Sequence, residues 1–482
     1  MKYDYDMIVI GGGAAGLTAA GMSALLGAKT ALIEEHRLGG DCTWVGCIPS
    51  KTLLKAARVA HQTRTADRFG LNATNPSIPF PQLMEHVRRT RQQVYGEADA
   101  PPNMEKLGVE VIAAHARFTD PHTVEITEGE SRKITSRYFV IATGSRPKIP
   151  PTSPGFAVEC LTNETLFELT VQPKRLLVLG AGPVGVEMAQ AFQRLGSDVT
   201  IVAPDSGILA KDDPEHARVL QERLAGEGVS FLLGHKVEAL SRDDRALRAT
   251  LDNGRIIACD AALAAIGRQA NTGALGLEKA GVATGEKGIP VDRHCRTSQR
   301  HIFAVGDVAG RYQFTHMAEH MSKVAVTNAI LHWPMKLDEK HVVWCTFTEP
   351  ELAHLGESEE NVRKRKAKYA VYRFPFQKLD RAITDGETTG EVKVITDSSG
   401  KILGASILGV NAGEMIAEYA LAMRNGLRIS KIADTIHAYP TYMLGDKRAA
   451  DQAAYRQLDS PMLGVLGKIF GYRGVRRGSA AL

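Results

Sequence analysis

The sequence DMIVIGGGAAG, residues 6–16, predicts the start of a dinucleotide-binding fold. Its apolar residues 7–10 indicate a buried strand, and the glycines indicate a tight turn that opens a helix. A G-x-G-x-x-G turn lets the backbone approach a pyrophosphate at a helix N-terminus, where N–H groups and the helix dipole attract an anion. The glycines with this spacing are Gly11, Gly13 and Gly16.

A carboxylate follows the turn at the distance that such a site needs. Glu34 lies 23 residues after Gly11, directly after the predicted strand 30–33. A carboxylate at that place can hold the hydroxyl groups of a ribose. We therefore expect Glu34 and Ala15 to contribute to the dinucleotide site together with the glycines.

The same pattern recurs in the middle of the chain. LLVLGAGPVG, residues 176–185, predicts a second strand, turn and helix, followed by the predicted strand 199–202. Two such βαβ units favour parallel sheets and two dinucleotide sites. The glycines of the second turn are Gly180, Gly182 and Gly185.

The second unit lacks the acidic residue at the end of its second strand. Ala203 and Pro204 stand there, followed by Asp205. The missing carboxylate removes an obstacle to a 2′-phosphate, so the pattern favours NADPH over NADH. No arginine follows at once, and Asp205 could still reach a ribose, so both nicotinamide cofactors stay open.

Composition is that of an ordinary globular protein. The chain has 482 residues, 44% hydrophobic and 23% charged, which is enough for about three domains. A net charge of +5 gives no argument for nucleic acid. The apolar strand 7–10 runs straight into glycines, which leaves no room for a signal peptide, and no apolar run reaches the roughly 18–20 residues that span a bilayer. We expect a cytoplasmic protein without stable membrane insertion.

Two of the six cysteines lie close together, in GGDCTWVGCIPSK, residues 39–51. A zinc site would need further nearby ligands, which the sequence does not offer. Cys42 and Cys47 enter a predicted helix, and a helix N-terminus lowers the pKa of a thiol from about 8.5. The pair therefore indicates a redox-active disulfide rather than a metal or structural site.

This cysteine motif resembles that of the class I pyridine nucleotide–disulfide oxidoreductases, and the resemblance extends nearly from end to end. Further matching stretches are Ala142-Thr143-Gly144, FAVGD at residues 303–307, and Thr348-x-Pro350-Glu351. The resemblance implies FAD, NAD(P)H and a homodimer.

The resemblance also implies roles for single residues. Cys47 would face the flavin and Cys42 would attack the substrate. Lys51 and Glu187 would flank the flavin near the nicotinamide, and a cation there stabilises the anion of the reduced flavin. Further implied cofactor residues are Gly40, Thr143, Gly144, Gly267 and Asp307.

The chain departs from the family pattern near its C-terminus. Members that reduce disulfides carry a His-Pro-Thr-x-x-Glu run, whose histidine shuttles a proton; here Tyr439 and Leu444 take the histidine and glutamate positions. A tyrosine, with a pKa near 10, is a poor base at neutral pH. We expect Tyr439 from the partner subunit to line the site, and His437 either to replace the missing base or to make a structural contact.

The acceptor of the electrons stays open between three classes. Mercuric reductases resemble this family with tyrosine in place of the histidine, which favours a soft metal ion such as Hg(II), but their C-terminal cysteine pair is absent here. A lipoyl or other disulfide partner is the second class. Direct reduction of a quinone by the flavin, with regulatory cysteines, is the third.

The predicted fold is α/β, with two Rossmann-like dinucleotide-binding domains and a C-terminal α+β dimerisation domain. We expect an FAD-binding domain over 1–150, an NAD(P)-binding domain over 151–270, a central domain over 271–341 and an interface domain over 342–482. The proline-rich stretch 147–154 would link the first two, and the basic C-terminal tail would be solvated or packed at an interface.

Overall fold

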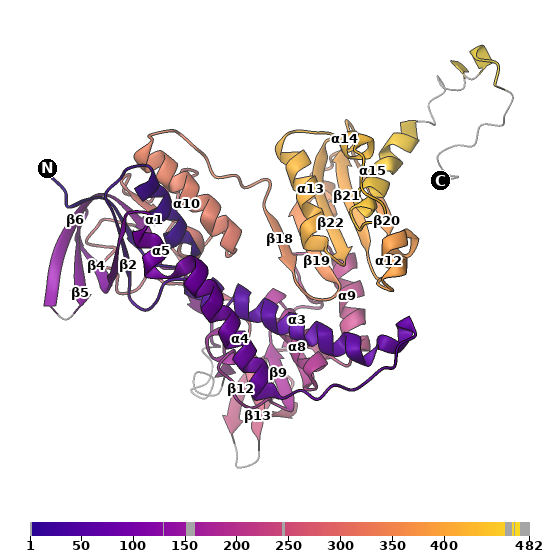
Figure 1. The fold of residues 1–482 in the computed structure, drawn as a ribbon, viewed down its shortest axis with the longest axis horizontal. Coiled ribbons are helices and arrows are strands. Elements are labelled where there is room, and N and C mark those ends of the chain that lie inside the picture. Colours follow the sequence, from indigo (N-terminus) through magenta and orange to yellow (C-terminus); the bar gives the residue numbers. More distant parts are fainter. Residues whose placement is uncertain are drawn as a thin grey trace. The chain divides into compact units, whose positions relative to one another are not determined.

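The computed structural model describes residues 2–128, 130–150, 160–242, 246–457, 465–466 and 468–472 (Figure 1). It contains two compact units. The first comprises Met1–Thr63, Asn75–Pro204 and Ser230–Asp338. The second comprises Arg64–Thr74, Asp205–Val229 and Glu339–Leu482. Half of the predicted 147–154 linker and most of the C-terminal tail lie outside the described residues.

A parallel sheet in the first unit carries the first glycine turn. Its strands have the order β3-β2-β1-β6, and β17 pairs with the other side of β6. They are β1 (Tyr5–Ile10), β2 (Thr30–Glu34), β3 (Val109–Ala113), β6 (Glu130–Ile141) and β17 (Ile302–Ala304). All side chains from Met7 to Ile10 are buried, as expected for a strand covered on both faces.

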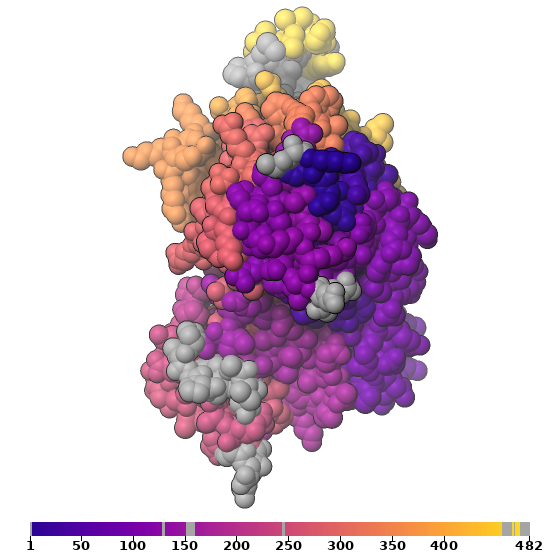
Figure 2. Space-filling model, turned by 90° about the vertical axis from the view of Figure 1, so that its left-hand side faces the viewer, coloured from indigo at the N-terminus to yellow at the C-terminus, as the bar shows by residue number. Residues whose placement is uncertain are grey.

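Strand β6 belongs to two kinds of pairing. Its second half, Ser136–Ile141, pairs in parallel with β1. Its first half pairs antiparallel with β5 (Thr123–Glu128), which pairs with β4 (His115–Asp120). Helix α1 (Ala14–Leu25) packs on α10 (Thr315–Ile330). Figure 2 shows these indigo, purple and salmon segments, distant in sequence, side by side on one face.

A second parallel sheet carries the second glycine turn. Its strand order is β11-β10-β9-β15-β8, and α8 (Pro183–Leu195) follows the turn. The strands are β8 (Cys160–Leu161), β9 (Arg175–Leu179), β10 (Asp198–Ala203), β11 (Ser230–Leu233) and β15 (Ala261–Ala264). The antiparallel strands β12 (Val237–Arg242), β13 (Leu247–Leu251) and β14 (Ile256–Cys259) form a smaller sheet. Both predicted βαβ units are therefore present.

A two-stranded ribbon lies between the two parallel sheets in the sequence: one strand follows β6 of the first sheet, and the other follows β15 of the second. Strand β7 (Ser145–Pro147) pairs antiparallel with β16 (Arg268–Ala270). The cysteine motif lies in α2 (Gly40–Trp44) and α3 (Cys47–Arg64). Helix α4 (Phe80–Val94) continues into a π-helical turn, η2 (Tyr95–Asp99), and then α5 (Pro101–Glu105).

The second unit is built on an antiparallel sheet with the order β18-β19-β22-β21-β20. Its strands are β18 (Val343–Thr346), β19 (Glu351–Gly356), β20 (Tyr369–Pro375), β21 (Glu391–Asp397) and β22 (Ile402–Gly409). The helices are α9 (Pro214–Gly226), α11 (Glu359–Lys364), α12 (Asp380–Thr384), α13 (Ala412–Arg424), α14 (Ile429–Asp434) and α15 (Leu444–Gln457). The core forms between the sheet and helices such as α13, around Met415 and Tyr419. The predicted C-terminal α+β fold is confirmed.

Candidate functional site

The two cysteines of the motif lie on consecutive helices. Cys42 lies within α2, and Cys47 is the first residue of α3. Both are partly buried thiols in this structure. A hydrogen bond from the Cys42 thiol, with smaller contributions from Thr315 and Lys51, lowers the pKa of Cys47 to about 6. The same hydrogen bond and burial raise the pKa of Cys42. The hydrogen bond thus favours the thiolate form at Cys47 and the thiol form at Cys42.

Thr315 is a site residue that the sequence did not indicate. Its hydroxyl Oγ1 lies 3.4 Å from the Cys47 sulfur, although the two residues are 268 positions apart. Thr315 also begins α10, a helix of 16 residues. A hydroxyl donor at a helix N-terminus stabilises a nearby thiolate, because the N–H groups there favour negative charge.

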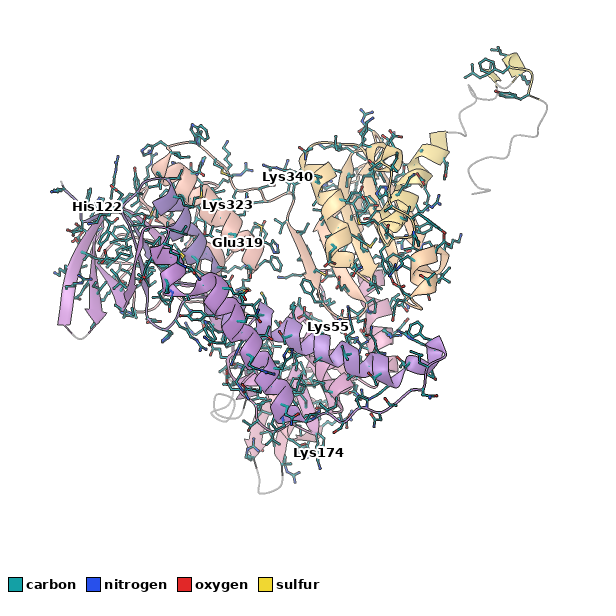
Figure 3. All side chains as sticks on the ribbon, in the orientation of Figure 1. Lys55, His122, Lys174, Glu319, Lys323 and Lys340 are labelled. Carbon is teal, nitrogen blue, oxygen red and sulfur yellow. The ribbon has the colours of Figure 1, made fainter. Side chains whose placement is uncertain are left out.

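Lys51 and Glu187 form an ion pair across two predicted domains. Lys51 Nζ lies 2.9 Å from Glu187 Oε2, with Lys51 on α3 and Glu187 on α8. The Glu187 side chain is 7% exposed. Lys55 lies one turn after Lys51 on α3 and is exposed (Figure 3). The pair connects the cysteine helix to the helix that follows the second glycine turn.

The first glycine turn has the shape that a dinucleotide requires. Gly11 has φ +104°, and a Cβ on it would lie 2.4 Å from the Ala142 carbonyl oxygen. A Cβ on Gly16 would lie 1.7 Å from the Gly11 oxygen, so neither position admits a side chain. At Gly13 the nearest such atom is 3.7 Å away, on Gly40. The outer glycines thus serve close packing, and the middle one leaves room for a ligand.

Glu34 ends β2 and braces this turn. Its Oε2 accepts a 2.6 Å hydrogen bond from the Gly12 N–H, and its Oε1 accepts a 2.8 Å hydrogen bond from the His36 N–H. The carboxylate therefore stands beside the glycine turn with a fixed orientation, as a ribose-binding acid would need. Ala15, on the first turn of α1, is buried against Gly306.

Asp307 lies in η3 (Gly306–Ala309), directly after β17. Its Oδ2 accepts a 2.6 Å hydrogen bond from Ser145 Oγ and lies 3.6 Å from Arg268 Nε. Burial raises the pKa of Asp307, while Ser145 and Arg268 lower it. These contacts bring Asp307 to the same end of the parallel sheet as the first glycine turn, because β17 and β6 run parallel.

The remaining cofactor candidates lie around the β7–β16 ribbon. Thr143 Oγ1 donates a 2.7 Å hydrogen bond to the Asn271 carbonyl, and the Gly144 carbonyl accepts from the Asn271 N–H at 3.0 Å. Gly144 and Gly267 have φ values of +67° and +113°, which favour glycine at both ends of the ribbon. These residues lie where the chain passes between the first and the second parallel sheet, at the β7–β16 ribbon.

The second glycine turn repeats the geometry of the first. Gly180 has φ +105°, and a Cβ on it would lie 2.5 Å from the Ala265 oxygen. A Cβ on Gly185 would lie 2.2 Å from the Gly180 oxygen, whereas one on Gly182 would meet nothing within 4 Å. The turn therefore offers open backbone at the N-terminus of α8, where a pyrophosphate binds.

The neighbouring strand end adds basic side chains to this region. Ala203 is the last residue of β10, and its carbonyl accepts a 3.1 Å hydrogen bond from the His235 N–H. His235 Nδ1 lies 2.9 Å from Asp252 Oδ1, and Lys236 is exposed. The site thus has an apolar residue at the end of β10 and two basic residues after β11.

The C-terminal candidates lie in the second unit and have different surroundings. Tyr439 is 69% exposed, and its hydroxyl donates a 3.0 Å hydrogen bond to Asp380 Oδ2, which raises the tyrosine pKa. His437 points inward: its side chain is 6% exposed, and its Nε2 lies 3.0 Å from Glu418 Oε1. Glu418 thus holds the His437 imidazole, an arrangement that serves a structural contact and also the orientation of a base.

Two classes of site are not found in the described part of the chain. No group of three or more His, Cys, Asp or Glu residues there could hold a metal ion. None of the described helices is long and apolar enough to cross a membrane.

Both parts of the chain match known families. Residues 5–322 match the family described as pyridine nucleotide-disulphide oxidoreductase. Residues 342–447 match the dimerisation domain of the same family.

Relatives with this architecture carry different names. The chain is 34% identical over 450 residues to the dihydrolipoyl dehydrogenase of Chlamydia muridarum, which covers 92% of this chain and 95% of the relative. It is 33% identical over 456 residues to the mercuric reductase of Lysinibacillus sphaericus, which covers 93% of this chain and 82% of the relative.

Solved structures agree with this grouping. LpdA from Mycobacterium tuberculosis matches with a TM-score of 0.87 at 27% identity, covering 93% of this chain and 99% of that one. The Cu(II) complex of the HOCl-induced flavoprotein disulfide reductase RclA from Escherichia coli matches with a TM-score of 0.82 at 29% identity, covering 94% and 99%.

Proposed function

The chain belongs to the pyridine nucleotide-disulphide oxidoreductase family, and we propose that it is an NAD(P)H-dependent flavoenzyme whose Cys42–Cys47 pair passes electrons to a soft metal ion such as Hg(II). The observation that carries the proposal is the thiolate site at Cys47, with Thr315 and the Lys51–Glu187 pair beside it. FAD would take a hydride from the nicotinamide and pass the electron pair on.

The cysteines complete the transfer. Two electrons break the Cys42–Cys47 disulfide and leave a Cys47 thiolate and, after uptake of one proton, a Cys42 thiol. Lys51 would stabilise negative charge that accumulates near the reduced flavin, and Glu187 would hold the ammonium in place. Cys42 would release its proton, and the two thiolates would bind a soft divalent metal ion. Their electron pair would reduce Hg(II) to the metal while the Cys42–Cys47 disulfide forms again.

The C-terminal substitutions favour a metal ion over a disulfide. A disulfide substrate needs a proton for its leaving thiolate, whereas a metal ion does not. Tyr439 and Leu444 take the places of the proton-shuttling dyad, and the hydrogen bond to Asp380 raises the pKa of Tyr439. The mercuric reductase of Lysinibacillus sphaericus is a relative at 33% identity. A lipoyl or other disulfide acceptor is the second candidate, because dihydrolipoyl dehydrogenases are at least as similar.

We propose NADPH as the preferred donor. Ala203 leaves no carboxylate at the end of β10 to repel a 2′-phosphate, and His235 and Lys236 follow the adjacent strand. The ratio of kcat/KM for NADPH to that for NADH tests this directly. Substitution His235→Ala should lower this ratio, since it removes a basic group that NADH does not need.

We further propose a homodimer with the domain order FAD-binding, NAD(P)-binding, central and interface, over 1–150, 151–270, 271–341 and 342–482. The match of residues 342–447 to a dimerisation domain supports the homodimer. In that assembly the partner subunit's Tyr439 would line the metal site next to Cys42. The quinone reductase alternative would leave the cysteines without a direct role.

Single cysteine substitutions separate these functions. Cys42→Ser and Cys47→Ser should each abolish NADPH oxidation driven by Hg(II) and leave quinone reduction by the flavin. Cys160→Ser, a partly exposed cysteine outside the motif, is the control. Retained Hg(II)-dependent activity in both variants would refute the metal proposal, and lipoamide reduction without Hg(II) reduction in the parent would favour the disulfide candidate.

A further inference from the structure

Several neighbours fix the segment Asp41–Cys47 in place. Thr43 Oγ1 donates a hydrogen bond to the Asp99 carboxylate at the end of the π-helical turn η2. The Trp44 indole N–H donates to the Leu38 carbonyl at 2.7 Å. Such π-helical turns often occur at functional sites. These contacts come from the same half of the unit as the segment itself.

Two other contacts reach the segment from the NAD(P)-binding half. The Asn163 side-chain amide donates a 3.3 Å hydrogen bond to the Val45 carbonyl, between the two cysteines. The Arg268 guanidinium donates to the Asp41 carboxylate, directly before Cys42. Asp41 and Arg268 are 227 positions apart in the sequence.

Arg268 is the centre of a small polar network. Its Nε donates a 2.6 Å hydrogen bond to Ser145 Oγ, and its Nη2 donates a 2.8 Å hydrogen bond to the Ser145 carbonyl. Its Nη1 lies 3.4 Å from Asn163 Oδ1, and its Nε lies 3.6 Å from Asp307 Oδ2. The planar fork of a guanidinium can serve all these partners at once, which a lysine ammonium cannot.

The charges explain why a cation is needed there. Asp41 follows Gly40, whose Cα neighbours the Gly13 turn that would hold a pyrophosphate. A carboxylate at that place repels a bound anion unless a cation neutralises it. Partial burial raises the pKa of Asp41, and the Arg268 guanidinium lowers it. Arg268 thus contacts two carboxylates, Asp41 and Asp307, and its positive charge favours the ionised form of each.

The position of Arg268 in the fold links two sites. Arg268 begins β16, directly after Gly267 and a few residues after β15. The Ala265 carbonyl, between β15 and Gly267, is the atom against which Gly180 packs in the second glycine turn. The backbone before Arg268 therefore packs against the second glycine turn, and the Arg268 side chain contacts the cysteine segment at Asp41.

We propose that Arg268 is a positioning residue for the proposed disulfide chemistry, which acts through Asp41 by holding the Cys42–Cys47 segment in register with the flavin. The inference rests on the proposed function. Removal of the guanidinium frees the Asp41 carboxylate and the start of α2, and the electron pair then passes slowly from the reduced flavin to the disulfide. Asp41→Asn leaves the contact between Arg268 and Asp307 in place, so reduction of the flavin by the nicotinamide is unaffected in that variant.

The test uses the flavin-loaded full chain and measures two rates after mixing with NADPH without oxygen. The first is the bleaching of flavin absorbance, and the second is the appearance of titratable thiols. We compare Arg268→Gln, Arg268→Lys, Asp41→Asn and the double variant of Arg268→Gln with Asp41→Asn. The control is Arg175→Gln, which removes a guanidinium that forms an ion pair with Asp260 at 2.6 Å, away from the cysteine segment.

We expect at least about ten-fold slower thiol appearance in Arg268→Gln and Asp41→Asn, and no further loss in the double variant. Flavin bleaching should be unchanged in Asp41→Asn, which keeps the contact between Arg268 and Asp307. Arg268→Lys should stay slow, because charge alone does not restore the fork. Arg175→Gln should match the parent. If Arg268→Gln does not fold, Asp41→Asn and Arg268→Lys decide the matter.

Parental rates of thiol appearance in the folded Arg268 and Asp41 variants would overturn the positioning role alone. Independent, multiplying effects of the two single substitutions would also overturn it, because the residues would then not act as a pair. If the parent itself gains no thiols with NADPH, the disulfide chemistry fails, and the positioning role fails with it.

Discussion

At the scale of single residues, the surroundings lower the pKa of Cys47 and raise the pKa of its neighbour Cys42. Cys47 accepts a hydrogen bond from the Cys42 thiol and lies 3.4 Å from the Thr315 hydroxyl, and its pKa is lowered to about 6. The hydrogen bond from Cys42 therefore favours the thiolate form of Cys47, the state in which a sulfur donates electrons. The hydroxyl of Thr315 is one cause that can be removed without touching either cysteine.

Substitution Thr315→Val should raise the pKa of Cys47. The hydroxyl stabilises the thiolate and not the thiol, so its loss moves thiolate formation to higher pH, by about one pH unit for one hydrogen bond to a charged group. The pH dependence of thiolate absorbance in the reduced enzyme measures the shift. Thr52→Val, which removes a hydroxyl that bonds the Ile48 carbonyl on α3, should leave the midpoint in place. An equal midpoint in Thr315→Val and the parent would rule out the hydrogen bond.

Substitution Lys51→Met should slow reduction of the flavin by NADPH. The ammonium is the cation that stabilises charge on the reduced flavin, so we expect a loss of about ten-fold or more in the rate and a lower flavin potential. Stopped-flow bleaching and a potentiometric titration measure both. Lys55→Met, one turn further along α3, supplies the matched control and should behave as the parent. Equal rates in both variants would remove Lys51 from the proposed site.

The sequence predicted part of this site and missed the rest for a physical reason. Cys42 and Cys47 lie in one short motif, and a helix start next to two thiols is visible in the sequence. Thr315 and Arg268 act across 268 and 227 positions, through contacts that exist only after the sheets have assembled. No local spacing marks a threonine or an arginine as the neighbour of a distant cysteine segment.

At the scale of elements, helix α9 shows a buried ionic anchor. Lys393 on β21 lies 2.7 Å from Asp213, the N-cap of α9, and 2.9 Å from Glu359 on α11. The Lys393 and Asp213 side chains are 3% and 4% exposed. His216 of α9 is also buried, and its Nδ1 lies 2.8 Å from Ser406 Oγ on β22. Charges hidden from water in this way must be paired.

Substitution Lys393→Met should destabilise the protein strongly. It leaves Asp213 buried without its cation, and breaking a buried pair costs about 3–5 kcal/mol. The shift in the denaturant midpoint of unfolding measures it. The control is Lys364→Met, because Lys364 pairs with Glu360 on the exposed face of α11, and such surface pairs contribute at most about 1 kcal/mol. Similar midpoints in the two variants would show that Lys393 does not anchor α9.

The helices and strands themselves were easier to predict than the sheets on which the helices pack. Apolar runs followed by glycine turns predicted both βαβ units. Helix α9, in contrast, follows β10 in the sequence but lies in the second compact unit. Periodicity tells a helix from a strand, whereas the sheet that a helix covers depends on side chains from distant segments, here Lys393 and Ser406.

At the scale of the whole molecule, the first unit combines two glycine turns with one cysteine pair. Gly11 and Gly180 occupy equivalent tight turns: Gly11 packs against the Ala142 carbonyl and Gly180 against the Ala265 carbonyl. The Lys51–Glu187 ion pair joins the helix of the cysteines to the helix of the second turn. We infer that the chain stores electrons in two places, in a bound flavin and in the Cys42–Cys47 couple.

An anaerobic titration of the flavin-loaded enzyme with NADPH measures that storage most directly. Reduction of FAD takes two electrons and reduction of a disulfide takes two more, so we expect four electrons per subunit in the parent and two in the Cys42→Ser, Cys47→Ser double variant. Uptake of only two electrons by the oxidised parent, with no gain in thiols, would show that Cys42 and Cys47 take no part in electron transfer.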